Sequence, residues 1–136
     1  VQGYGDASYA HSLLKQFKGE WVYNTDWKMI NGHPKKAGWI NAIQAAQKKV
    51  QKGIRLDCPV LVMSSDKSFP ETKDWNNEYL SSDIVLNVHD IQKYGQKLGN
   101  AVTRDTIQNG MHDLILSEKD SREHAYRSVF NWLQNK

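Results

Sequence analysis

A short, uninterrupted apolar run in the middle of the chain constrains the fold more than any other feature. Residues 59–63 read Pro-Val-Leu-Val-Met, and the polar residues Ser64, Ser65 and Asp66 follow directly. An apolar run of this length without polar alternation is typical of a strand buried on both faces, as in a parallel sheet. Parallel strands are joined by crossover connections, so helices should separate this strand from its neighbours.

The second half of the chain has the alternation that such a sheet needs. We predict a helix over residues 88–98 with Asn87 as its cap, a second strand over residues 101–107, and a last helix from about Ser117. The last helix opens with a capping-box-like pattern, Ser-x-x-Asp, that ends at Asp120. The order strand, loop, helix, strand, loop, helix predicts an α/β fold with parallel strands and right-handed crossovers.

In the first half of the chain we predict two helices, one on each side of an aromatic segment. Residues 8–17 form a short predicted helix and residues 38–52 a longer one. The aromatic residues 19–38 between them have no clean period and form either an ordinary part of the core or a pocket wall. We therefore divide the chain into residues 1–52, a helical cap or lid segment with the helix that follows it, and residues 53–136, a strand-helix-strand-helix part of an α/β core.

Three of the predicted helices carry apolar residues at helical spacing, which we expect to be buried. Gly53 is the expected C-cap of the first of them. The three faces consist of Trp39, Ile43, Ala46 and Val50; of Val88, Ile91, Tyr94 and Leu98; and of Tyr126, Val129, Phe130 and Leu133.

Charge and composition argue against several classes of protein. The chain has 18 basic and 15 acidic residues, and the basic ones are scattered without forming a run, so we do not expect nucleic-acid binding. No segment approaches the ~18 apolar residues of a membrane span, and no signal-peptide pattern opens the sequence. The single cysteine, Cys58, fits a reducing compartment. These features together predict a cytoplasmic protein.

His112 is the strongest candidate for chemistry. It lies on a glycine-containing turn, Asn-Gly-Met-His-Asp, between the second predicted strand and the last helix. A histidine on such a loop is held by a rigid scaffold yet reachable, and an ordinary pKa of about 6.5 lets it take and return a proton near neutral pH. The alternative is a surface histidine that bonds only to nearby backbone.

Metal and cofactor chemistry has little support in the sequence. The five histidines, His11, His33, His89, His112 and His124, lack metal-ligand spacing, and Cys58 has no cysteine partner. We predict no metal and no cofactor. Cys58, beside Pro59 at a strand start, is expected to be a small buried apolar residue and not a nucleophile.

The predicted sheet is incomplete. Two strands do not form a stable parallel sheet alone, because such a sheet must be covered on both faces and flanked by neighbours. The sequence also begins at Val1 without an initiator methionine. We therefore expect that a missing N-terminal half, or self-association, completes the sheet.

This arrangement resembles the C-terminal half of an α/β-hydrolase, whose catalytic triad follows the chain order Ser, Asp, His. The resemblance is to a bacterial group of lysophospholipase-like and serine-aminopeptidase-like hydrolases, and it extends over nearly all of the 136 residues. It implies that residues 4–38 belong to the cap over an acyl pocket. The segments that carry it are residues 19–21, 38–43, 59–66, 83–86 and 110–114.

The resemblance also implies roles for individual residues. His112 matches the triad histidine, a general base toward the serine and then a general acid toward the leaving group. Asp83 matches the triad acid, which would accept the ring N–H of His112 and fix its orientation. Asp66 is the alternative acid, because it stands closer to the end of the preceding strand. Asp113 and Asp90 are expected to be structural.

The chain departs from the family at the nucleophile. The elbow Gly-x-Ser-x-Gly occurs nowhere in the sequence, and a base with nothing to activate cannot carry out acyl transfer. We therefore expect this chain alone to be inactive. A longer parent would hydrolyse a small-molecule carboxylic ester such as a lysophospholipid or a monoacylglycerol. The alternative is a non-catalytic α/β module that binds a partner through its sheet edge and its tryptophan-rich segment.

Overall fold

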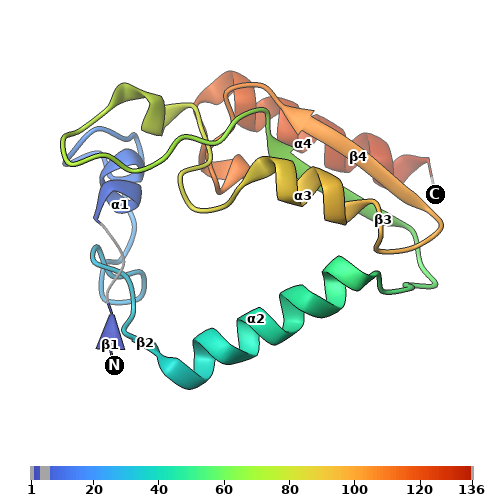
Figure 1. Cartoon of the computed structure of the whole chain (residues 1–136). Coiled ribbons are helices and arrows are strands. Elements are labelled where there is room, and N and C mark those ends of the chain that lie inside the picture. The colour runs from blue at the N-terminus through green and yellow to red at the C-terminus, as the bar shows by residue number, and fades with distance from the viewer. Residues whose placement is uncertain (1, 4–6, 136) are drawn as a thin grey trace.

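The computed structural model describes residues 2–3 and 7–135, and Figure 1 shows their arrangement. Tyr4, where the predicted cap segment begins, lies outside the described residues. The elements in chain order are β1 (Gln2–Gly3), α1 (Ser8–Leu13), β2 (Lys35–Lys36), α2 (Ala37–Lys52), β3 (Val60–Ser65), η1 (Asn77–Leu80), α3 (Val88–Gly95), β4 (Val102–Ile107), η2 (Leu114–Leu116) and α4 (Lys119–Gln134).

The predicted pair of parallel strands is confirmed. β3 and β4 are parallel neighbours, in a register that runs from Val60 opposite Val102 to Ser65 opposite Ile107. Within the described residues this sheet has two strands, and β1 and β2 form a separate short antiparallel pair. Figure 1 shows α3 and α4 on the two sides of the β3–β4 pair, so the class is mixed α/β.

The core lies beyond the carboxyl end of the strand pair, where α1 and the chain after it meet η1 and the loop after β4. The largest fully buried apolar side chains are Leu13, Tyr79 and Ile107. The Trp21 indole N–H donates to the Leu116 carbonyl at 2.7 Å, which ties the aromatic segment to the loop after β4. The N-terminal segment and the end of the sheet therefore form one packed unit.

Two predicted helices end early. α1 stops at Leu13 instead of residue 17, because the Lys15 N–H leaves the helical pattern and donates to the Trp21 carbonyl at 2.8 Å. α3 stops at Gly95 instead of residue 98, and the chain continues as a turn in which the Leu98 N–H bonds to the Gly95 carbonyl at 3.2 Å.

Two of the three predicted helix caps are confirmed. Asn87 caps α3 by accepting the His89 N–H at 2.9 Å, and Gly53, with φ of 95°, ends α2. The predicted capping box of α4 is wrong. Its cap residue is Glu118, and the Ser117 hydroxyl instead accepts the Met111 N–H at 2.8 Å.

Much of the predicted apolar burial is also wrong. α2 has no buried residue, and Trp39 is 55% exposed. α4 buries Ser121 and Ala125, whereas Phe130 on its predicted apolar face is 59% exposed. Two strands offer less surface than these helices could cover, so the larger side chains remain outside.

Two further observations concern Cys58 and the helices. Cys58 is exposed, which corrects the prediction that it is buried. None of the helices in the described part of the chain combines the length and the apolar character needed to cross a bilayer.

Candidate active site

The loop that carries His112 is fixed at the end of β4. Asn109 has a positive φ of 54°, a conformation that asparagine tolerates better than most residues. A Cβ on Gly110 would lie 2.7 Å from Leu114 Cδ2 and 3.1 Å from the Ile107 carbonyl oxygen, so a side chain at this position would force Leu114 to move. Met111 is buried, and its N–H bonds to Ser117. These contacts present the next residue, His112, at the carboxyl end of the sheet.

Asp66 holds this loop from the neighbouring strand. One of its carboxylate oxygens accepts the Asn109 N–H and the other accepts the Gln108 side-chain amide, each at 2.8 Å. The structure therefore places Asp66 at the base of the turn, where its carboxylate oxygens contact Ser65, Gln108 and Asn109. Of the two candidate acids, it is not the one that meets His112.

Asp83 is buried and rigidly held. Its side chain is 3% exposed, and its backbone is fixed by hydrogen bonds to Lys67 at 3.0 Å and to Phe69 at 3.1 Å just beyond the end of β3. Asp83 Oδ1 accepts the backbone N–H groups of Val85 and Leu86, both at 2.8 Å. A carboxylate held in this way cannot rotate freely, so it can orient a partner.

That partner is His112. Its Nδ1 lies 3.1 Å from both carboxylate oxygens of Asp83, and its side chain is 27% exposed. The hydrogen bond to Asp83 raises the pKa of His112, although burial acts in the opposite direction. Burial alone would raise the pKa of Asp83, but hydrogen bonds from His112, Leu86 and Val85 together lower it. The pair therefore favours an ionised acid beside a histidine that is readily protonated.

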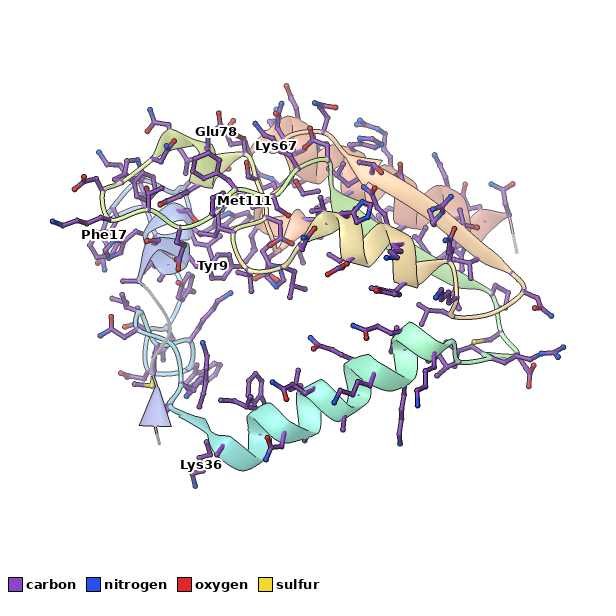
Figure 2. All side chains as sticks on the ribbon, viewed as in Figure 1. Tyr9, Phe17, Lys36, Lys67, Glu78 and Met111 are labelled. Carbon is purple, nitrogen blue, oxygen red and sulfur yellow. The ribbon has the colours of Figure 1, made fainter. Side chains whose placement is uncertain are left out.

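Asp113, expected to be structural, has more partners than the sequence suggests. Its carboxylate accepts hydrogen bonds from the Tyr9 hydroxyl and from Lys28 Nζ, the latter at 3.0 Å. The Tyr9 ring meets the His112 ring edge-on, with centroids 5.8 Å apart and planes at 79°. In Figure 2, Tyr9 lies where α1 approaches the loop of Met111.

A pocket lies beside these groups. It has a volume of about 430 Å³, and its lining includes Tyr9, Tyr23 and Lys28 together with Ile84 and Val85, which directly follow Asp83. Its lining also includes Met29, Ile30 and His33 from the aromatic segment. Concave, largely apolar spaces with a few polar groups are the usual form of small-molecule sites.

The structure thus brings together Asp83 and His112, separates Asp66 from them, and places Asp90 in the first turn of α3. Tyr9 and Lys28 were missed by sequence reasoning. Tyr9 fitted the apolar side of a short helix, and Lys28 is one of many scattered lysines, so neither gave a local signal. Within residues 2–3 and 7–135 there is no cluster of three histidine, cysteine, aspartate or glutamate side chains that could hold a metal ion.

No family model, curated protein or solved structure matches this chain. The resemblance to α/β-hydrolases therefore remains a prediction from the sequence.

Proposed function

We propose that this chain supplies the histidine and the acid of a serine hydrolase that cleaves carboxylic esters, of the α/β-hydrolase type. His112 is the general base and Asp83 is the residue that orients it. The contact of His112 Nδ1 with a buried, amide-anchored Asp83 carboxylate is the observation that carries this proposal.

The geometry supports these roles in three ways. Asp83 occupies the Nδ1 side of the ring, which leaves Nε2 for the nucleophile and the leaving group. The ionised carboxylate stabilises the imidazolium that forms when His112 takes a proton. Both residues lie past the carboxyl ends of parallel strands, where α/β folds place their ligands.

The substrate follows from the pocket and the resemblance. The apolar and aromatic lining beside Asp83 suits the acyl part of a small-molecule ester, of the lysophospholipid or monoacylglycerol kind. The serine belongs to a nucleophile-bearing segment outside these 136 residues, because the sequence contains no Gly-x-Ser-x-Gly.

The exposed apolar surface of α2, α3 and β3 supports a second role for the nucleophile-bearing segment, which would also complete the sheet. α2, α3 and β3 border an apolar groove of about 500 Å³ that includes Ile43, Val50, Val62 and Ile91. The same groove is the observation that favours a second candidate function, a non-catalytic module that binds a protein partner.

Fluorophosphonate labelling of the complete protein that carries this chain tests the first function against the second. We expect a covalent label on the wild type, loss of the label in His112→Ala and Asp83→Ala, and retention in Asp66→Ala. The isolated 136-residue chain should not be labelled. A well-folded complete protein that takes no label would reject the hydrolase and favour the binding module.

A further inference from the structure

The side chain that follows His112 links it to a distant part of the chain. Asp113 accepts a hydrogen bond from Tyr9 on α1, 104 positions away, and an ion pair from Lys28, 85 positions away. Lys28 Nζ also lies 5.1 Å from the centroid of the Tyr9 ring, in a cation-π arrangement. The three residues form a closed cluster in which each contacts the other two.

Tyr9 joins this cluster to the histidine itself. Its ring packs edge-on against the His112 ring while its hydroxyl donates to Asp113, so one side chain restrains two consecutive residues of the loop. Burial raises the pKa of the Tyr9 hydroxyl, and the adjacent Asp113 raises it further. The hydroxyl therefore stays protonated at neutral pH and remains a donor.

We propose that Tyr9 and Lys28 are positioning residues for His112 and act through Asp113, so that docking of residues 7–33 holds the Asp83–His112 pair in its working geometry. The inference rests on the proposed function for its catalytic meaning. The positioning itself is a property of this chain and can be measured without the nucleophile.

Charges around the ring give the proposal a measurable consequence. The groups that face His112 are the carboxylates of Asp83 and Asp113, the ammonium of Lys28 and the neutral Tyr9. Both carboxylates raise the pKa of His112, whereas Lys28 lowers it. Because Lys28 is paired with Asp113, its positive charge offsets part of the increase in the His112 pKa that the Asp113 carboxylate causes.

The test is nitrogen and proton NMR of the imidazole groups in the full 136-residue chain, with the His112 signals assigned by their absence in His112→Gln. Lys28→Met removes the ion pair to Asp113 and should broaden or abolish the low-field Nδ1–H signal of His112, because the loop is then held less firmly against Asp83. Tyr9→Phe keeps the ring but removes the hydroxyl, and should broaden or abolish the low-field Nδ1–H signal, since the loop and ring are then held less firmly.

Two further variants sharpen the test. Asp113→Asn should lower the midpoint of His112, and in that background Lys28→Met should have a smaller effect, because the lysine has lost its anchor. The matched control is Glu20→Gln, which removes the ion pair between Glu20 and Arg122 at 2.6 Å that joins the same two parts of the chain. The control should change neither the midpoint nor the Nδ1–H signal.

Several results would overturn the proposal. They are a wild-type Nδ1–H signal in both Lys28→Met and Tyr9→Phe, or the same loss of that signal in Glu20→Gln. The last result would mean that loosening the N-terminal segment anywhere has this effect. If the NMR results are as expected but the complete protein takes no fluorophosphonate label, the positioning holds and the hydrolase function fails.

Discussion

Replacing Asp83 by asparagine and by alanine should lower the free energy of unfolding by clearly different amounts, because one carboxylate oxygen bonds to the backbone as well as to His112 and the other bonds to His112. Asp83 Oδ1 accepts both backbone N–H groups, from Val85 and Leu86, at 2.8 Å. Asparagine keeps an oxygen at this position and can present its amide nitrogen to His112 Nδ1. Alanine removes every one of these contacts.

The magnitudes follow from the number and kind of bonds lost. A hydrogen bond to a charged group contributes about 1.5–3 kcal/mol, and a neutral one about 1 kcal/mol. Val85 and Leu86 are half exposed, so the lower end applies to their bonds. We expect Asp83→Ala to lower the free energy of unfolding by about 3 kcal/mol and Asp83→Asn by about 1 kcal/mol, since the latter keeps two neutral bonds.

The loss in Asp83→Asn should also depend on pH. The pKa of His112 is raised, so its contribution to stability is complete below its unfolded pKa of about 6.5 and is lost as the pH rises through the folded pKa. The pKa of Asp83 is lowered, so its contribution is present above about pH 3.9 and is lost as the pH falls through the folded pKa. The pair therefore stabilises the chain most between about pH 4 and 6.5.

Urea denaturation at pH 5.5 and at pH 8.5 measures both effects, with Asp66→Asn as a matched carboxylate-to-amide control away from His112. The gap between wild type and Asp83→Asn should shrink at the higher pH, while the gap between the two Asp83 variants stays constant. Equal losses of unfolding free energy in the asparagine and alanine variants would refute the role given to Oδ1. A difference between wild type and Asp83→Asn that does not change with pH would refute the role of the charged carboxylate beside His112.

The remaining predictions concern the scaffold and use the same urea assay. Gly95→Ala should destabilise the chain by about 1–3 kcal/mol, since its Cβ would lie 2.8 Å from Val62 Cγ1. Gly38→Ala, where nothing lies within 4 Å, should stabilise it by about 0.5–1 kcal/mol, and a loss there would contradict the reasoning. Asn87→Ala should lower the free energy of unfolding by about 1 kcal/mol, because it removes the side-chain oxygen that accepts the His89 N–H at the start of α3. Asn87→Ser should recover most of this loss.

The parts of the fold that depend on local pattern were predictable. Both core strands, their parallel pairing and the cap at Asn87 follow from the apolar run of residues 59–63, the order of the elements and turn chemistry. The ends of α1 and α3 were not, because a long-range bond from Lys15 to Trp21 and a turn after Gly95 decide them. Apolar periodicity also failed for Trp39, since a helix face is buried only where another element covers it.

The candidate site shows the same division. The resemblance favoured Asp83 over Asp66 as the partner of His112, and the structure brings these two side chains together. The roles of Tyr9 and Lys28 could not be predicted, because their contacts with Asp113 join residues 104 and 85 positions apart and produce no local sequence pattern.

The most direct test of the central claim is the pH dependence of the fluorophosphonate labelling rate in the complete protein. We expect the rate to rise with pH as His112 loses its proton, with a midpoint above 6.5 that matches the NMR titration of that ring, because the Asp83 contact raises its pKa. A labelling rate that does not change across the His112 titration, or that survives in His112→Ala, would contradict it.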